Sequence, residues 1–497
     1  WLLCYLLVLV GLAGYGFHRL SIVYLYWKNR NNKPQPKARF QELPVVTVQL
    51  PMFNEKFVVD RLLESVAALD YPQDKLEIQI LDDSTDDTTE QCYRKVEELK
   101  SRGFDAVCIH RTDRTGFKAG ALEAATKVAK GEFLLILDAD FVPEPDLLQK
   151  TIHFFTDENV GLVQTRWGHI NREYNLLTRI QGMYLDGHFA MEQTARNRSG
   201  RFFTFNGTAG IWRKCVIGDA GGWSHDTLTE DMDLSYRVQL RGWRFIYLND
   251  VVTPAELPVD MDGFKSQQHR WTKGSIQVCQ KILLDIWRSN APLKAKVEAT
   301  THLTCNYSYL LLALLCFLVY PICTQRIPEN ETVFMWFVNV ALFFMTSVAV
   351  CIFYMSAQIV VRPKSWWKEL PYLPLLLTLS VGMAVNNAKA VLEAIFGHQS
   401  AFVRTPKYGV DRKEDRRHVS QLKRNGYRAI KSVVIPVLEI ACGTFFLNLI
   451  IIMIRQGHYL SPILMIPFLG FYYTGFCSLG RMISNLLPAK QTAKAKN

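Results

Sequence analysis

Carboxylate and amide side chains directly follow three short apolar runs in the N-terminal third of the chain. In chain order they are Asn54, Glu55, Asp82, Asp83, Asp138 and Asp140. The two carboxylates of Asp138-Ala139-Asp140 repel each other unless a cation lies between them. A divalent ion bound to phosphate oxygens fits such a pair, so the spacing predicts a metal site that also binds phosphate.

Two further motifs combine charged and aromatic side chains. One is Thr229-Glu230-Asp231, and the other is Gln267-Gln268-His269-Arg270-Trp271, which opens a helical pattern. The simplest interpretation of the second motif is an amphipathic helix on a membrane surface, with Trp271 as its interface anchor. That interpretation is compatible with a role for the same residues in chemistry.

Short apolar runs alternate with helical patterns between residues 40 and 260. The predicted strands are 45–50, 77–81, 106–109 and 133–137, and the predicted helices are 57–69, 86–101 and 118–129. Such alternation is typical of βαβ units and predicts an α/β domain with a mostly parallel sheet. Open parallel sheets bind ligands at the carboxyl ends of their strands, which is where the acidic side chains lie. Asp86 is an exception, because an Asp at that point commonly caps the helix that follows.

Five apolar runs are long enough to cross a bilayer, which needs about 20 apolar residues. They are 1–27, 302–324, 333–361, 432–455 and 459–486. Glu439 lies in one of these runs and should not face lipid, so it either lines a channel or is paired inside the bundle. The stretch 370–396 is apolar, but it has basic flanks and charged residues. This favours an interfacial or re-entrant helix over a sixth span.

The net charge of +11 is concentrated in four basic segments that abut the apolar runs. They are 28–39, 362–368, 404–431 and the end of the chain after Pro488. This is the positive-inside pattern, and it places all four segments on the cytoplasmic side. Nucleic-acid binding also uses basic segments, but no recognition helix accompanies these, so we expect no nucleic-acid partner. An apolar content of 49% excludes a disordered or collagen-like chain.

Four motifs in one order resemble the processive members of glycosyltransferase family 2, which include cellulose, chitin and hyaluronan synthases. The motifs are Asp82-Asp83, Asp138-x-Asp140, Thr229-Glu230-Asp231 and Gln267-x-x-Arg270-Trp271. The stretches 49–55 and 402–408 are most similar to the cellulose-synthase-like branches that make mannan or glucomannan and the glucan backbone of xyloglucan. The resemblance covers nearly the whole chain. It implies a GT-A-type α/β domain, cytoplasmic and inserted in a bundle of transmembrane helices.

The resemblance also implies which residues bind a nucleotide sugar. They are Phe53, Asn54, Glu55, Asp82 and Asp83 for the base and ribose, Lys118 for the diphosphate, and Asp138 for the nucleotide. Asp138 and Asp140 would hold Mg²⁺ or Mn²⁺, which neutralises the charge that grows on the leaving diphosphate. Phe141 departs from bacterial cellulose synthases, which often have His there, and this puts one contact to the metal or nucleotide in doubt.

In the family's reaction, Asp231 would be the general base that takes the proton from the acceptor hydroxyl as it attacks the anomeric carbon. A single inversion at an α-linked donor then gives a β-linkage. The residues expected to hold the acceptor end and the diphosphate are Asn206, Gly207, Glu230, Gln267, Arg270 and Trp271. An arginine fork suits phosphate, and an indole face suits a sugar ring.

Residues 402–407 resemble the gating loop that closes over the nucleotide in cellulose synthase. The family pattern is Phe-x-Val-Thr-x-Lys, and the corresponding residues here are Phe402, Arg404, Thr405 and Lys407, with Arg404 in place of Val. Such a loop must be cytoplasmic to meet the donor. It therefore supports the interfacial interpretation of 370–396.

The predicted organisation places a cytoplasmic catalytic domain between membrane helices. Its parts are a transmembrane helix at 1–27, the glycosyltransferase domain at 28–263, an interfacial helix with the Gln-x-x-Arg-Trp motif at 264–290, two transmembrane helices at 302–361, an interfacial helix with the gating loop and a basic segment at 362–431, two transmembrane helices at 432–487, and a cytoplasmic tail at 488–497. Such a protein belongs in a bacterial inner membrane, or in the Golgi or plasma membrane of a eukaryote.

The predicted function is polymerisation of hexose from a nucleotide sugar, GDP-mannose or UDP-glucose, into an exported β-1,4-linked polysaccharide. The growing polysaccharide chain and the lipid bilayer are the other expected partners. Transfer of one sugar to a lipid carrier is the alternative, but dolichol-phosphate transferases usually lack the Gln-x-x-Arg-Trp motif. A non-catalytic scaffold is a third hypothesis. It is disfavoured because Asp138, Asp140, Asp231 and Trp271 are all present.

Overall fold

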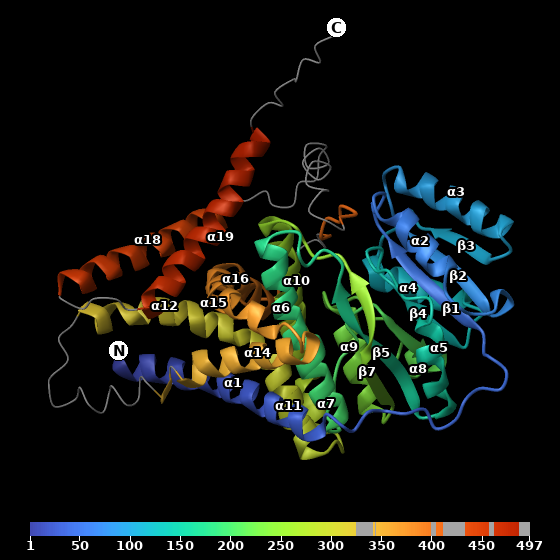
Figure 1. The fold of residues 1–497 in the computed structure, drawn as a ribbon, viewed down its shortest axis with the longest axis horizontal. Coiled ribbons are helices and arrows are strands. Elements are labelled where there is room, and N and C mark those ends of the chain that lie inside the picture. Colours follow the sequence, from blue (N-terminus) through green and yellow to red (C-terminus); the bar gives the residue numbers. More distant parts are fainter. Residues whose placement is uncertain (325–340, 343, 399–403, 411–432, 457–461, 487–497) are drawn as a thin grey trace, which may run out of the picture.

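The computed structural model describes residues 1–324, 341–342, 344–398, 404–410, 433–456 and 462–486. Figure 1 shows a sheet with its flanking helices on one side of the molecule and a bundle of long helices on the other. Between them lie α6 (Leu176–Asp186), α10 (Met261–Arg288) and α11 (Leu293–Thr304).

The described residues form one seven-stranded sheet with the order β3-β2-β1-β4-β6-β5-β7. The strands are β1 (Val46–Met52), β2 (Leu76–Asp82), β3 (Asp105–His110), β4 (Phe133–Ile136), β5 (Val160–His169), β6 (Gly210–Arg213) and β7 (Arg244–Ala255). The β1–β2, β2–β3, β1–β4 and β5–β7 pairs are parallel, whereas β6 is antiparallel to both neighbours. The predicted mostly parallel sheet is therefore confirmed, and the four predicted strands correspond to β1–β4.

Helices cover both faces of the sheet because successive side chains of each strand point to opposite faces. In β4, Phe133 and Leu135 join one apolar cluster, while Leu134 and Ile136 join the other. The first cluster includes α2 (Val59–Ala67), α3 (Thr88–Ser101) and α5 (Leu147–Thr151). The second includes α4 (Phe117–Val128), α8 (Lys214–Asp219) and α9 (Glu230–Leu240). The predicted helices correspond to α2, α3 and α4, and Asp86 accepts the Thr88 backbone N–H at 3.0 Å where α3 begins.

Four stretches of helix within the described residues are long and apolar enough to cross a membrane: Leu2–Asn29, Leu293–Pro321, Phe344–Val361 and Val434–Arg455. They contain α1 (Leu2–Asn29), α12 (Ser308–Thr324), α14 (Ala349–Val361) and α18 (Val434–Arg455). They correspond to four of the five predicted spans, although the second begins earlier, at Leu293. This is the pattern of a membrane protein.

The two remaining apolar stretches do not form unbroken apolar helices as long as the four candidate spans. Within 370–396, η6 (Trp366–Tyr372) and α15 (Leu373–Gly382) are followed by α16 (Ala384–Ile395), and the two parts are bent by 41°. This geometry fits a broken span or a re-entrant loop, so the interfacial position stays a prediction. In α19 (Pro462–Leu486) the apolar part is Leu464–Gly480, shorter than the other spans, and its crossing also stays a prediction.

A buried ion pair and its hydrogen bonds join α10 to α18 and α19. The Lys265 ammonium donates to Glu439 Oε2 at 2.6 Å in α18, and to the Thr474 carbonyl and the Ser478 hydroxyl in α19 at 3.1 and 2.9 Å. The side chains of Lys265 and Glu439 are only 1% and 0% exposed. Glu439 is therefore paired inside the bundle, which is one of the two alternatives predicted for it.

Removing one partner of this pair should destabilise the protein strongly. We expect Glu439→Ala to cost about 3–5 kcal/mol, because it leaves the Lys265 charge buried without compensation. The double variant Lys265→Met/Glu439→Leu should recover most of the loss. Thermal unfolding of the detergent-solubilised chain measures both effects. As a control, Glu97→Ala breaks an exposed pair with Lys100 and should cost at most about 1 kcal/mol. Equal destabilisation by the single and double variants would contradict this account.

Candidate active site

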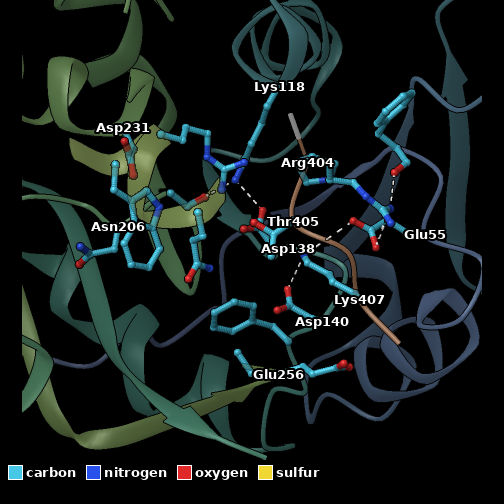
Figure 2. A pocket seen from close by; sticks show the side chains of 18 of the residues that line it. Glu55, Lys118, Asp138, Asp140, Asn206, Asp231, Glu256, Arg404, Thr405 and Lys407 are labelled. Atoms are coloured by element: carbon cyan, nitrogen blue, oxygen red, sulfur yellow. Dashed lines mark hydrogen bonds and ion pairs between the residues drawn. The ribbon is translucent and has the colours of Figure 1, made fainter. Parts of the chain in front are cut away.

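A cavity of about 190 Å³ opens at the carboxyl ends of the strands. It brings together most of the predicted site residues, which are Phe53, Glu55, Asp83, Lys118, Asp138, Asp140, Asn206, Gly207, Glu230, Asp231, Gln267, Arg270, Trp271, Arg404, Thr405 and Lys407. In Figure 2, Asp138 lies below Lys118 and Asp140 lies beside Lys407, and Asp231 and Asn206 lie on the side opposite Glu55. Phe402 lies outside the described residues.

Asp138 follows β4 and is fixed from two directions. The Lys118 ammonium, near the start of α4, lies 2.5 Å from Asp138 Oδ1 and donates to the Gly207 carbonyl at 2.9 Å. The Asp138 backbone N–H donates to the Thr208 hydroxyl at 2.8 Å. Burial alone would raise the pKa of Asp138, but Lys118 and Lys407 hold it below its ordinary value. Asp138 is therefore a carboxylate at neutral pH.

The segment 404–410 lies across the same site. The Lys407 ammonium lies 2.5 Å from Asp140 Oδ1 and 3.8 Å from Glu55 Oε1. Although burial would lower the pKa of Lys407, Asp140 and Glu55 raise it, so the side chain stays charged. Arg404 pairs with Glu55 at 3.0 Å and donates to the carbonyls of Phe53 and Asn54.

Glu256, directly after β7, anchors the other end of this segment. Its buried carboxylate accepts the backbone N–H groups of Tyr408, Gly409 and Val410 at 3.0, 3.0 and 3.2 Å. Burial raises the pKa of Glu256 to about 7, in spite of these donors and of Arg61. One side chain thus holds three consecutive amides beside the strand ends.

The donor set suits a divalent ion that shares its ligands with a diphosphate. Asp138 and Asp140 present carboxylate oxygens to the cavity, and Mg²⁺ and Mn²⁺ prefer such ligands. No group of three or more His, Cys, Asp or Glu side chains placed to hold a metal occurs in the described part of the chain. The two carboxylates therefore fit an ion whose remaining ligands come from phosphate oxygens and water. Phe141, the expected departure, packs edge-on against Trp167 with ring centroids 5.1 Å apart.

Phe53, next to Glu55 in the chain, and Arg114 also line the cavity. The Arg114 guanidinium lies 3.4 Å from the Phe53 ring centroid, and Arg111 binds Asp83 through two hydrogen bonds of 2.8 and 2.6 Å. Asn54 and Asp82 are not among the residues that line the cavity. Asn54, at φ +55°, accepts the Thr85 backbone N–H with its side-chain oxygen at 2.8 Å.

Asp82 does not line the cavity, and its side chain is fully buried. Its carboxylate contacts His110 Nδ1 and accepts from the Thr89 hydroxyl, both at 2.7 Å, and it accepts from the Ser84 backbone N–H at 3.1 Å. All of these contacts are to the protein itself. Asp82 therefore positions the loop that carries Asp83, and direct contact with a nucleotide stays a prediction.

A second cavity of about 180 Å³ continues from the first toward the membrane helices. The two cavities share Trp167, Asn206, Asp231 and Trp271. The second is also lined by Arg19 of α1 and Tyr354 of α14. The Asp231 side chain therefore lies where a compartment above the strand ends meets one that reaches into the bundle.

Two features hold Asp231 and its neighbours close together. Gly207 has φ +79°, and a Cβ there would come 3.0 Å from Asp231 Oδ2, so a side chain would crowd the carboxylate. Asp231 lies in the first turn of α9 and its Oδ1 accepts the Met232 backbone N–H at 2.8 Å. Burial, then the adjacent Glu230, raises the pKa of Asp231 to about 7. A carboxyl with that pKa is suited to exchange a proton near neutral pH.

A buried polar network orients Asn206. The Asn206 side-chain oxygen accepts from Gln193 Nε2 at 2.6 Å, and its Nδ2 lies 3.0 Å from His188 Nε2. His188 Nδ1 lies 3.0 Å from Glu192 Oε2. Because a carboxylate only accepts, Nδ1 carries the proton and Nε2 accepts from Asn206. Burial, together with Arg196 and Arg19, lowers the pKa of His188 to about 3, so the ring is neutral.

Comparison with known proteins assigns the family. Residues 44–274 match the model described as Glycosyltransferase like family 2, and residues 210–456 match that described as Cellulose synthase. The chain belongs to glycosyltransferase family 2 and is cellulose-synthase-like. This confirms the family predicted from the four motifs.

Curated relatives of this glycosyltransferase include two plant proteins. It is 42% identical over 286 residues to glucomannan 4-beta-mannosyltransferase 2 of Arabidopsis thaliana, covering 54% of this chain and 53% of that one. It is 40% identical over 277 residues to glucomannan 4-beta-mannosyltransferase 1 of Oryza sativa subsp. japonica, covering 55% and 53%. The matched region thus spans about half the length of these relatives.

A solved structure shares the fold. The mannosyltransferase PcManGT from Pyrobaculum calidifontis, in complex with GDP-Man and Mn²⁺, is similar with a TM-score of 0.56 at 20% identity. The match covers 80% of this chain and 100% of the other. This likeness confirms the GT-A-type architecture of the α/β domain.

Several residues of the candidate site carry no signal in the sequence motifs. Arg111 and Arg114 follow β3, so they lie after the carboxyl end of a strand, as the acidic site residues do. Trp167 and Glu256 belong to β5 and to the end of β7, strands that the apolar pattern did not reveal. His188 lies in a π-helix, η3 (Gly187–Gln193), whose irregular pitch no periodicity rule predicts.

The anchoring role of Glu256 leads to a prediction about amide exchange. We expect Glu256→Gln to accelerate deuterium exchange at 408–410 by at least about tenfold, because a hydrogen bond to a charged acceptor contributes about 1.5–3 kcal/mol. Mass spectrometry of the full chain measures the exchange of this segment. Glu42→Gln, which alters an exposed carboxylate, is the matched control and should leave 408–410 unchanged. Unchanged exchange in Glu256→Gln would mean that other contacts hold the segment.

Proposed function

We propose that this protein is a membrane-embedded inverting glycosyltransferase that polymerises mannose from GDP-mannose into a β-1,4-linked mannan or glucomannan. The observation that carries the proposal is the position of Asp231 on the wall shared by two cavities. One cavity holds the paired carboxylates and lysines that suit a nucleotide diphosphate, and the other leads toward the membrane helices. Mannose is favoured over glucose because both curated relatives are named as mannosyltransferases.

On the donor side, the side chains around Phe53 and Asp83 would hold the base and ribose. Lys118 and Arg270 would face the diphosphate and stabilise the charge that it gains on leaving. Asp138 and Asp140 would hold Mg²⁺ or Mn²⁺, which supplies further electrostatic stabilisation of the leaving diphosphate.

On the acceptor side, a sugar stacked on the Trp271 indole would present a hydroxyl to Asp231. The Asp231 carboxylate takes the proton while the hydroxyl oxygen bonds to the anomeric carbon, and the bond from that carbon to the diphosphate breaks. Attack from the face opposite the leaving group inverts the configuration and gives a β-linked product. Asn206, held by His188 and Gln193, would bind the sugar that has just been added.

Binding of the donor would reorganise 404–410. Lys407 and Arg404 now bind Asp140 and Glu55, and an anionic diphosphate offers both cations a stronger partner. The segment would then close on the nucleotide, as expected of a gating loop, with the catalytic domain on the cytoplasmic side. Transfer of a single sugar to a lipid carrier is the alternative, and it uses the same donor site.

The pH dependence of transfer should report Asp231. Its pKa is raised, so below about pH 7 it is protonated and cannot act as a base, and above about pH 7 it is a carboxylate. We therefore expect the rate with saturating GDP-mannose to rise with pH through a limb near 7. Because the pKa of Glu256 is also near 7, the Glu256→Gln variant should be measured alongside and should keep the limb. Loss of the limb in that variant would assign it to Glu256.

Asp231→Asn should lower the transfer rate by about 10²–10⁴, the contribution of a general base, while binding of GDP, measured calorimetrically, stays unchanged. The matched control is Asp226→Asn, which alters an exposed carboxylate paired with Lys281 just before α9. It should leave the rate near that of the unaltered enzyme. If Asp231→Asn retains full activity, another group is the base.

The product identifies the donor and the type of transfer. Membranes containing the full chain should convert labelled GDP-mannose, with Mg²⁺ or Mn²⁺, into a polymer that an endo-β-1,4-mannanase degrades. UDP-glucose alone should give much less polymer. A labelled lipid without polymer would favour the alternative function, and release of GDP without either product would indicate hydrolysis.

A further inference from the structure

A basic groove lies where the first membrane helix meets the α/β domain. It has a volume of about 500 Å³ and is lined by Lys28, Arg198, Arg201 and Lys294. A neighbouring hollow of about 610 Å³ shares Arg198 and Arg201 with it. No Asp or Glu is among the described residues that line either hollow. The groove therefore concentrates positive charge without an acidic side chain of its own.

The groove is located at the ends of two helices that are apolar enough to cross a membrane. Lys28 is in the last turn of α1, and Lys294 is in the first turn of the stretch that begins at Leu293. In Figure 1 the end of α1 lies beside α7 (Thr194–Arg198) and α11, between the helical bundle and the sheet. Tyr24 and Leu293 are 61% and 66% exposed. Aromatic and apolar side chains beside lysines mark the depth of lipid headgroups.

Among the described residues, Lys28, Arg198 and Lys294 contact an aromatic ring and backbone carbonyls. The Lys28 ammonium lies 5.5 Å from the centroid of the Tyr24 ring, and Lys294 donates to the Ser199 carbonyl at 2.9 Å. Arg198 donates to the Arg30 carbonyl. Burial lowers the pKa of Arg198, and Tyr26 and Asp250 offset only part of that shift. Four cations held together in this way gain free energy when an anion binds among them.

We propose that this groove binds the phosphate headgroup of an anionic phospholipid from the leaflet that faces the α/β domain. Arginine forks match the geometry of phosphate oxygens, and the lysine ammonium groups add point charges. Basic pockets between membrane helices on the cytoplasmic side are suited to such headgroups. A lipid also explains the apolar surface beside the groove, because its acyl chains can pack against Tyr24 and Leu293 while the phosphate meets Arg201 and Lys28.

The groove is connected to the acceptor side of the site through α7. Arg198 ends this five-residue helix. Within it, Arg196 binds Glu192 Oε2 at 3.3 Å and Glu298 Oε1 at 2.9 Å. Glu192 in turn holds His188, which holds Asn206. A headgroup bound at Arg198 therefore contacts the helix that supports the acceptor network.

Lipid binding can be measured independently of catalysis. The full chain is placed in phosphatidylcholine nanodiscs that contain fluorescent phosphatidic acid, and the affinity is obtained from energy transfer to the probe. We expect Lys28→Gln/Arg201→Gln to lower the affinity for phosphatidic acid at least about tenfold, because two surface charges are lost. The matched control is Lys364→Gln/Lys368→Gln, which removes two exposed cations just after α14. It should change the affinity by less than the groove variant.

Three outcomes would overturn the proposal. An equal loss in the control would show diffuse attraction to the basic segments in place of a site. An unchanged affinity in the groove variant would exclude the groove. Tight binding of soluble glycerol 3-phosphate with the same dependence on Lys28 and Arg201 would indicate a site for free phosphate. Thermal unfolding verifies that the variants are folded. If the double variant is not, Lys28→Gln alone, which changes an exposed side chain, should still lower the affinity about fivefold.

Discussion

Asp138 and Asp140 are two negative charges on one short loop, and the protein compensates each with a separate lysine. Lys118 comes from α4, within the sheet domain, and Lys407 comes from a segment that follows the bent helices α15 and α16. Because both ammonium groups lie 2.5 Å from their carboxylates, the site around Asp138 and Asp140 is complete only when a distant part of the chain returns to it. The ion pair of Arg404 with Glu55 and the hydrogen bonds from three backbone amides to Glu256 hold this distant segment in place.

The part of the site around Asn206 and Trp271 also depends on contacts between distant parts of the chain, but with different partners. Trp271 and Lys265 lie on the same helix, α10, one at the cavities and the other in the buried pair with Glu439. Arg19 of the first membrane helix pairs with Glu192, which orients His188 and, through it, Asn206. The loops after the strands therefore line much of the first cavity, and α1 and α14 help to line the second. Both sets of elements meet at Asp231, whose side chain lines the two cavities.

Charge has two different uses in this molecule. Inside, cations and carboxylates are paired at short distances, since an unpaired charge away from water is costly. Where α1 meets the α/β domain, Lys28 and Arg201 line a groove whose described lining includes no Asp or Glu, which suits an anion supplied from outside the chain.

The strand and helix patterns of the first 140 residues, the order of the motifs and four of the spans follow from the sequence, because local periodicity and the composition of each segment determine them. The family follows too, since its motifs are short and local. The antiparallel β6, the strands β5 and β7 and the roles of Glu256, His188 and Arg114 were decided by tertiary structure. Each of these depends on contacts between residues far apart in the chain, such as Glu256 with Tyr408, and no local pattern records such a contact. Asp82 is a further example. Its position after a strand follows from the local sequence, whereas its burial against His110 depends on residues distant in the chain.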